Sequence, residues 1–428
     1  MLILDPITNK LIEFIKQHNH KAYIIGGAVR DSVLNLKYND IDISVDASLD
    51  EIKEMFKDYS IKEYKKGHTI GIVFLDKYVE LSSLDENNIN VDLKNRDFTI
   101  NAIAVIDDKI LDPYNGLGDI KNRVIRTIMD PAKTIKDDPI RILRAIRFDA
   151  TLHFNVDPKL LDFINNNYKL LDNVSEERIR DELNKILLTR KPSRIIEKYF
   201  NVFTYLIPPL KDTYGFLQHN IYHHLDVFKH TMSVLENTDN ILELKYIALF
   251  HDIKKPECFS MDEKGVGHFY RHYEKSAEYA NEFLNKYKFS NEFIKKVYKI
   301  IYFHDYPLSL KDSSILKFLN KFGKLDLDLY FKIRVADIKG QNPNLINRIE
   351  LMNKIEIKTK KLALEGIYTV NGLVIDGKDI EALGYNKNKI NFILKKVLEA
   401  YMEGKIKNTI ADITNYLNNN HFGDDDIE

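Results

Sequence analysis

Two acidic residues and a glycine pair near the start of the chain have the types and spacing that phosphate chemistry needs. Asp40 and Asp42 alternate with apolar residues, so in a strand both carboxylates project from one face. Carboxylates about 7 Å apart along a strand can share Mg²⁺, which takes oxygen ligands and bridges to substrate phosphates. Gly26 and Gly27 stand between an apolar stretch and a short helical pattern, where backbone N–H groups can cradle a triphosphate. Either feature alone is commonly a turn or surface decoration; together they predict a metal-dependent nucleotide site.

The elements that must position these residues follow from hydrophobic periodicity. Helical patterns cover residues 6–18, 28–34 and 48–56, and Ser48 with Glu51 predicts a capping box at the start of the third. Strand patterns cover 23–25, 40–45, 68–75 and 77–82. Glu80 lies inside the last strand, where it is either a third metal carboxylate or a residue on a solvated sheet face.

The order strand, Gly-Gly-x-x-Arg-Asp, strand, Asp-x-Asp resembles polymerase-β-type nucleotidyltransferases, and more narrowly the bacterial CCA-adding tRNA nucleotidyltransferase and poly(A) polymerase family. The resemblance covers about residues 20–420. It implies an α/β head followed by an all-α remainder, with catalytic Asp40, Asp42 and Glu80, of which Asp40 and Asp42 hold Mg²⁺. The nucleotide-binding residues that it implies are Gly26, Gly27, Arg30, Asp31, Arg96, Asp97, Asn101, Asp138, Arg141, Arg144 and Arg147.

The block Asn95–Ala102 resembles the family's R-R-D-x-x-x-N motif, with Asn95 in place of the first Arg. Arg96 can neutralise a phosphate, and Asp97 and Asn101 suit ribose hydroxyls. Only residues 81–95 separate Glu80 from Arg96. Family members that build the whole CCA end usually have a longer loop here, so the short connection resembles the CC-adding subgroup.

A helix is predicted over residues 138–148, with one charged residue every third position. This pattern alone is typical of a solvated basic flank. In the family, an Asp and an Arg three residues on read the incoming base, which implies that Asp138 and Arg141 imitate a Watson–Crick edge. Arg144 and Arg147 would lie beside the phosphates. Residues 175–186 resemble the family's E-R-x-R-x-E-x-x-K helix, which is interpreted as structural.

Histidine density rises after residue 220, and the order His, His-Asp, distant Asp resembles the HD superfamily of metal-dependent phosphohydrolases. The resemblance assigns His230, His251, Asp252 and Asp337 as ligands of one or two divalent transition metals. The alternative is a set of half-buried polar histidines. Lys254 stands where Gly is usual and Tyr273 follows His272 where an acid is usual, which weakens the prediction of vigorous hydrolysis.

The last helices carry lysines that either meet tRNA backbone phosphates or form a solvated face: Lys387, Lys389, Lys395 and Lys396. The domains predicted are a head (1–125), a helical neck (126–210), an HD domain (211–345) and a helical tail (346–428).

Composition limits the remaining possibilities. The chain has 428 residues and a net charge of −1, so any RNA site must be a local patch. The single Cys258 excludes a disulfide framework, and no apolar run reaches membrane-spanning length. A cytoplasmic protein with tRNA, CTP and ATP as partners, and without an obligate protein partner, is expected. A poly(A) polymerase and an HD phosphohydrolase acting on RNA ends remain the alternative functions.

Overall fold

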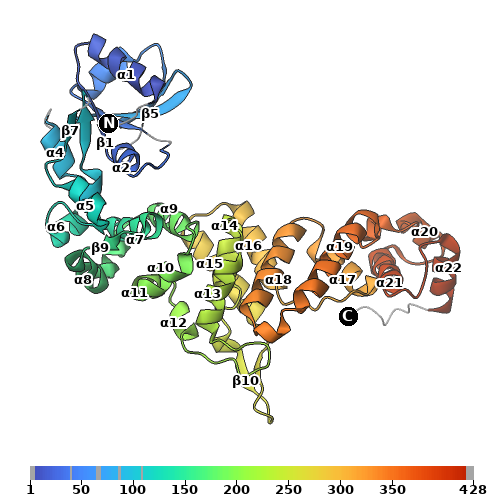
Figure 1. The fold of residues 1–428 in the computed structure, drawn as a ribbon. Coiled ribbons are helices and arrows are strands. Elements are labelled where there is room, and N and C mark those ends of the chain that lie inside the picture. Colours follow the sequence, from blue (N-terminus) through green and yellow to red (C-terminus); the bar gives the residue numbers. More distant parts are fainter. Residues whose placement is uncertain (1–4, 39–40, 64–68, 85–87, 108, 421–428) are drawn as a thin grey trace. The chain divides into compact units, whose positions relative to one another are not determined.

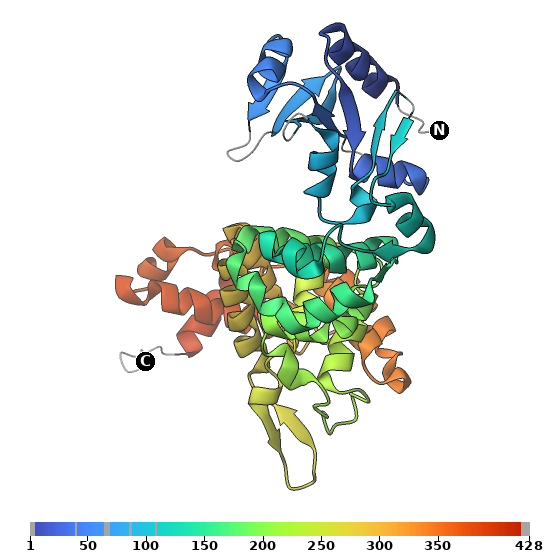
Figure 2. The same ribbon diagram turned by 90° about the vertical axis from the view of Figure 1, so that its left-hand side faces the viewer.

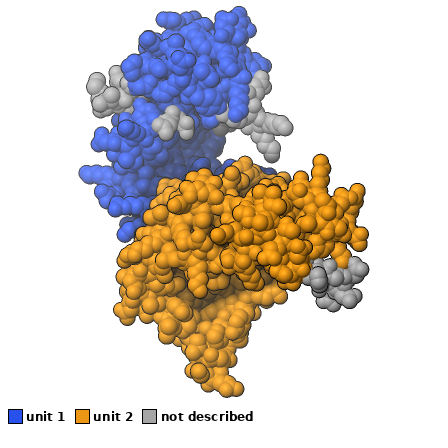
Figure 3. Space-filling view, turned by 90° about the vertical axis from the view of Figure 1, so that its right-hand side faces the viewer, with its two compact units in different colours: residues 1–206 blue, residues 207–428 orange. Residues whose placement is uncertain are grey.

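The computed structural model describes residues 5–38, 41–63, 69–84, 88–107 and 109–420. Asp40, one of the expected metal ligands, lies outside the described residues. The chain divides into two compact units, Met1–Leu206 and Ile207–Glu428, which Figure 3 colours separately. This boundary lies close to the expected end of the neck at residue 210, and the finer division into four domains stays a prediction.

The first unit is built on a mixed sheet in its N-terminal half (Figure 1). Within the described residues the strand order is β3-β4-β5-β2-β1-β6-β7. Neighbouring strands are antiparallel except β2 and β5, which are parallel. The strands are β1 (Ala22–Ile25), β2 (Asp42–Val45), β3 (Ser60–Glu63), β4 (Thr69–Phe74), β5 (Lys77–Ser83), β6 (Ala104–Ile106) and β7 (Lys109–Leu111).

The helices of the head begin where the sequence supplies caps. Asp5 accepts backbone hydrogen bonds at the start of α1 (Pro6–Gln17), and Ser48 and Glu51 form the predicted capping box of α3 (Leu49–Met55). The remaining elements are α2 (Gly27–Val33), α4 (Ile89–Lys94), the 3₁₀ turn η2 (Thr99–Asn101) and α5 (Gly116–Asn122). The prediction of an α/β head is confirmed.

The rest of the first unit is mainly helical, and one predicted helix start is wrong. Asp138 does not belong to the helix of Arg141, because it is the extended C-cap of the preceding helix. Pro139 follows it, and the residue before a proline is disfavoured in helical conformation. The elements are β8 (Val124–Ile125), α6 (Pro131–Asp137), α7 (Arg141–Leu152), β9 (Asn155–Val156), α8 (Pro158–Asn167), η3 (Tyr168–Asn173), α9 (Glu176–Leu187), α10 (Pro192–Lys198) and α11 (Phe200–Leu206).

The second unit is a helical domain around the apolar helix α14, whose residues from Leu244 onward are buried. Helix α14 contacts α13, α15, α16 and α18, and the hairpin β10–β11 extends from the helices (Figure 2). The elements are α12 (Leu210–Thr213), α13 (Val227–Asn237), α14 (Leu242–Phe250), η4 (Pro256–Cys258), β10 (Phe259–Met261), β11 (Gly267–Phe269), α15 (His272–Lys286), α16 (Asn291–Phe303), α17 (Asp312–Phe322), α18 (Leu327–Gly340), η5 (Pro343–Leu345) and α19 (Arg348–Glu365).

The chain ends in a small helical bundle with a core of its own, which includes Ile380, Ile393 and Ile413. Its elements are η6 (Val370–Gly372), α20 (Gly377–Ala382), η7 (Lys387–Lys389), α21 (Ile390–Met402) and α22 (Ile410–Asn419). Among the described residues, every helix is too short or too polar to cross a bilayer.

Candidate active site and histidine cluster

The head brings two of the predicted carboxylates together. Asp42 and Glu80 are partners in the parallel pairing of β2 and β5, and both residues are half-buried. Residues in register on adjacent parallel strands lie about 5 Å apart and project from the same face of the sheet. Both carboxylates therefore face one side of the sheet, as a shared divalent cation requires.

The predicted glycine turn lies against the same carboxylate. Gly26 follows β1 as the N-cap of α2 with a φ of 70°, and a Cβ added there would meet the Arg96 guanidinium at 2.7 Å and Asp42 Oδ2 at 3.4 Å. The backbone conformation therefore favours glycine, and a side chain there would displace the end of Arg96. Asp92 pairs with Arg96 at 3.3 Å. The sequence did not single out Asp92, although an acid four residues before Arg96 on a helix was a readable signal.

The residues expected at the ribose form a buried network with one another. Asn101 accepts a hydrogen bond from Arg30 (2.5 Å) and donates one to Asp97 Oδ1 (2.9 Å). Asp97 Oδ2 accepts from Arg144 Nε at 2.7 Å. Arg30 also pairs with Asp31. The network joins α2, η2 and α7, so these residues hold the head and the start of the neck helices in one arrangement.

Asp97 is expected to stabilise the first unit, and the effect depends on pH. Burial raises its pKa, but the Arg144 charge and the hydrogen bonds from Asn101 and Phe98 outweigh it, so the pKa lies below the ordinary 3.8. A depressed folded pKa gives stability that is present above pH 3.8 and lost as the pH falls through the folded pKa. Asp97→Asn should lower the free energy of unfolding by about 2 kcal/mol at pH 7.

This stability difference is measured by denaturant unfolding of both proteins between pH 3 and pH 7. The exposed pair of Glu54 and Lys57 supplies the control, because Glu54→Gln should change the free energy of unfolding by less than about 0.5 kcal/mol. A difference between wild type and Asp97→Asn that persists undiminished at pH 3 would contradict the assignment to the Asp97 charge.

The two predicted base-reading residues are bonded to protein groups. Asp138 accepts two hydrogen bonds from Arg178, at 2.9 and 2.8 Å. Arg141 donates to the backbone oxygens of Thr134 (3.0 Å) and Asn95 (2.9 Å). Arg178, one of the charged residues of α9 that were predicted to form ion pairs, is thus the partner of Asp138. Arg147, expected near the phosphates, instead donates to the buried Glu182 at 2.6 Å.

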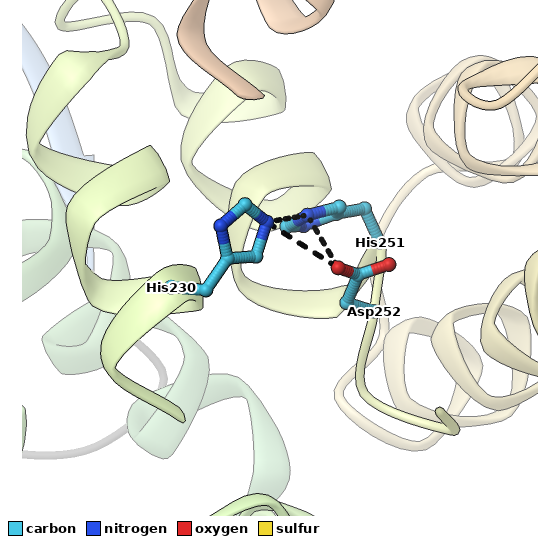
Figure 4. A group of neighbouring side chains, drawn as sticks. All are labelled: His230, His251 and Asp252. Carbon is cyan, nitrogen blue, oxygen red and sulfur yellow. Dashed lines mark hydrogen bonds and ion pairs between the residues drawn. The ribbon is translucent and has the colours of Figure 1, made fainter. Parts of the chain in front are cut away.

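In the second unit the structure brings the four predicted HD residues together. His230, on α13, has its Nε2 atom 3.3 Å from His251 Nε2, 3.4 Å from Asp252 Oδ2 and 3.1 Å from Asp337 Oδ1. Figure 4 shows three of them converging, with His251 and Asp252 at the end of α14. The two histidines and Asp252 are at most 1% exposed. Imidazole nitrogens and carboxylate oxygens of this kind suit a divalent transition metal.

The charged groups of this cluster shift one another's pKa. Burial lowers the pKa of His230, but Asp252 and Asp337 outweigh burial and raise the pKa to about 9. Burial raises the pKa of both carboxyl groups, and the neighbouring histidines outweigh it and lower both below the ordinary 3.8. The two carboxylates therefore favour the protonated form of His230. A bound cation would take over this role and release the proton.

Three further residues reach the same carboxylate and were not assigned by the sequence. His272 Nε2 lies 3.3 Å and His304 Nε2 3.6 Å from Asp252 Oδ1, and Lys255 Nζ lies 2.7 Å from Asp252 Oδ2. A cavity of about 750 Å³ opens on this cluster and is also lined by Arg334. The signal for His272 and His304 was their place in the histidine-rich stretch after residue 220.

The four tail lysines do not share one environment. Lys387 and Lys395 are exposed, and Lys396 is half-buried beside Glu399. Lys389 is only 6% exposed, which does not fit a contact with RNA phosphates. A lysine face for tRNA therefore rests on Lys387, Lys395 and Lys396, and stays a prediction.

Several solved structures and curated sequences that are similar to this chain are CCA-adding enzymes. The Bacillus stearothermophilus CCA-adding enzyme in complex with CTP aligns over 97% of this chain and 98% of its own, with a TM-score of 0.65 and 22% identity. The Thermotoga maritima CCA-adding enzyme complexed with tRNA aligns over 97% and 96%, with a TM-score of 0.63 and 21% identity. In sequence, the CCA-adding enzyme of Lactobacillus johnsonii is 26% identical over 96% of both chains. That of Bacillus licheniformis is 34% identical over 44% of this chain and 51% of its own.

Two family models match the first unit and the residues just after it. The model described as the poly A polymerase head domain matches residues 22–126, a range that contains the sheet with Asp42 and Glu80. With this head, the protein is a nucleotidyltransferase. The second model, described as a probable RNA and SrmB-binding site of polymerase A, matches residues 153–213. These comparisons support the resemblance to the bacterial CCA-adding enzyme and poly(A) polymerase family that the motifs predicted.

Proposed function

We propose that the protein adds C residues, as CC or the full CCA, from CTP and ATP to the 3′ end of tRNA without a nucleic-acid template. The observation that carries this proposal is that Asp42 and Glu80 are paired on adjacent strands and that Asp42 lies next to the Gly26 turn. The names of the relatives support the tRNA substrate, since CCA-adding enzymes align over nearly the whole chain. Such a role would be carried out in the cytoplasm.

In this reaction the tRNA 3′ hydroxyl attacks the α-phosphorus, the bond to the β-phosphate oxygen breaks, and pyrophosphate leaves. Asp40, Asp42 and Glu80 are the residues that would hold Mg²⁺, which lowers the pKa of the attacking hydroxyl and neutralises the leaving group when bound. The Gly26–Gly27 turn would contact the triphosphate, and Arg96, already beside Asp42, would add a positive charge.

We propose that Asp138 and Arg141 read the base. Arg178 now donates to both Asp138 oxygens through a planar pair of N–H groups, and a base amino group would take over one of these bonds. This exchange keeps the half-exposed Asp138 carboxylate hydrogen-bonded before and after nucleotide binding. Arg144, which pairs with Asp97 at 2.6 Å, would lie beside the phosphates.

The number of nucleotides added is tested by sequencing the products. tRNA ending before the CCA sequence is incubated with CTP and ATP together, and in parallel with each alone. The short connection between β5 and Arg96 favours products ending in CC with both nucleotides present. Products ending in CCA would assign the full activity, while long A-tails without C incorporation would identify a poly(A) polymerase and contradict the proposal.

A second activity is favoured by the histidine cluster. We propose that His230, His251, Asp252 and Asp337 hold a divalent transition metal and hydrolyse phosphate esters of RNA ends. Water adds to phosphorus, the ester bond breaks, and the leaving oxygen takes a proton from solvent. Lys255 and Arg334 line the cavity of about 750 Å³ and can attract a phosphate, and a cavity of this size admits a nucleotide.

A further inference from the structure

The cavity of about 750 Å³ in the second unit is lined by apolar side chains as well as by charged ones. Lys255 and Arg334 are the buried cations that can attract a phosphate. The apolar part of the lining includes Pro307, Leu308, Met352 and Ile355. A phosphate ion alone would need only the charged part. The lining therefore suits a phosphate ester that also carries an apolar group.

Two exposed tyrosines line the same cavity. Tyr222 is 47% exposed and Tyr270 is 69% exposed. The His268 ring is stacked on the Tyr270 ring, with an angle of 9° between their planes and 5.4 Å between their centroids. His268 thus covers one face of Tyr270, and the exposed area leaves the rest of the ring open to a second flat group. Nucleobases stack on aromatic faces of this kind.

Contacts with the segment that leads into α19 hold Tyr222 in place before any ligand binds. The guanidinium of Arg348 lies over the Tyr222 ring, 5.3 Å from its centroid. The backbone N–H of Asn342 donates to the Tyr222 carbonyl oxygen at 2.8 Å. A ring that is already ordered loses little conformational freedom when a base stacks on it. Tyr222 is therefore prepared for stacking.

The polar side chains next to Tyr222 are already hydrogen-bonded to protein groups. Gln341 accepts from Arg348 at 2.7 Å and donates to Asp337 at 2.9 Å. The Asn220 side-chain oxygen accepts from the backbone N–H of Tyr222 at 3.1 Å. Distinguishing one base from another requires donors and acceptors that face the base edge. Stacking, which every base can make, is the contact that this part of the cavity offers.

We propose that Tyr222 and Tyr270 stack the nucleobase of a nucleotide whose phosphate lies at Lys255 and Arg334, without selecting among the four bases. The inference rests on the phosphohydrolase proposed above for the same cavity and adds the part of the substrate that the cavity recognises. The nucleotide is the last one of a single-stranded RNA or a free nucleoside monophosphate. These two sources share one chemistry, and the experiment distinguishes them.

The test compares ligands with and without a base. Fluorescence anisotropy measures how the full chain binds a short single-stranded RNA with a 3′ phosphate, with metal ions chelated so that the RNA stays intact. The same RNA with an abasic last nucleotide should bind about tenfold more weakly. Tyr222→Leu and Tyr270→Leu should each remove most of this difference, while Tyr222→Phe, which keeps the ring, should preserve it.

Two control variants change exposed side chains that are not part of the cavity lining. Tyr214→Leu removes a tyrosine that is 62% exposed, and His224→Ala removes an exposed histidine. Both should bind the intact and the abasic RNA within about twofold of wild type. The four RNAs that differ only in the last base should bind within about threefold of one another, because stacking tolerates every base.

The position of the base is checked by photocrosslinking with 5-iodouridine as the last nucleotide. A crosslink to Tyr222 or Tyr270 supports the inference, and crosslinks confined to the first unit would overturn it. Equal binding of intact and abasic RNA, or a preference of more than tenfold for one base, would overturn it as well. Uridine 3′-phosphate that competes as well as the RNA would identify free nucleotides as the source, and weaker competition would identify RNA.

Failure of this inference and failure of the phosphohydrolase give different results. Base-dependent binding that is lost in Tyr222→Leu, without hydrolysis of either ligand when metal is restored, would refute the phosphohydrolase and leave the stacking site intact. Hydrolysis that proceeds equally well on intact and abasic RNA, with no effect of Tyr222→Leu on the KM, would refute the stacking site and leave the phosphohydrolase.

Discussion

Replacing Asp42 with asparagine is expected to lower the rate of nucleotide addition by about 10³-fold or more, because loss of one carboxylate charge removes several kcal/mol of transition-state stabilisation by the metal. The side chain is half-buried at the start of β2, and asparagine has nearly the same shape, so the fold should persist. The rate is measured as single-turnover incorporation of labelled CTP into tRNA that ends before the CCA sequence.

Asp50→Asn is the matched control, because Asp50 is an exposed carboxylate in the first turn of α3. It should leave the rate within about twofold of wild type. Glu80→Gln should also slow the reaction if Glu80 shares the metal with its strand neighbour. If Asp42→Asn retained a tenth of the wild-type rate, the metal-carboxylate role proposed for Asp42 would be wrong.

The second large effect is expected in the other unit. His251→Ala should abolish hydrolysis of p-nitrophenyl phosphate and of an RNA ending in a 3′ phosphate, by about 10³-fold, because it removes a nitrogen within 3.3 Å of His230 and 3.2 Å of Asp252. Nucleotide addition should stay within about twofold, since the carboxylates of the head are untouched.

Asp42→Asn gives the reciprocal result if the two reactions use separate sites: addition is lost and hydrolysis is retained. His224→Ala should retain both activities. Loss of hydrolysis in both Asp42→Asn and His251→Ala would mean that one site carries out both reactions. Hydrolysis that survives His251→Ala would remove the histidine cluster from catalysis altogether.

Local sequence patterns predicted most of the elements that carry the site. Period-two alternation located β2, and the capping box located the start of α3. The same reasoning misplaced Asp138, because its spacing to Arg141 matched a helix while Pro139 ended one. Spacing along a chain describes one helix face only where the helix is continuous.

Local sequence patterns could not predict contacts between residues that are distant in sequence. Asp97 was expected to contact ribose, yet it is bonded to Arg144 on another helix, a pairing that depends on how α7 packs. His272 and His304 lie in the histidine-rich stretch of the sequence, but the expected set of four metal ligands did not include them. Their position beside Asp252 depends on how α15 and α16 pack.

The strand order of the head also has a consequence for synthesis on the ribosome. β1 pairs with β2 early, but Asp42 gains its partner Glu80 only after β5 has emerged, and β6 must still return to the other edge of β1. Such non-local pairings form slowly. One edge of the apolar strand β1 therefore stays open for about eighty residues of translation, from Ile25 until β6 begins at Ala104, which exposes the nascent head to misfolding and to chaperones.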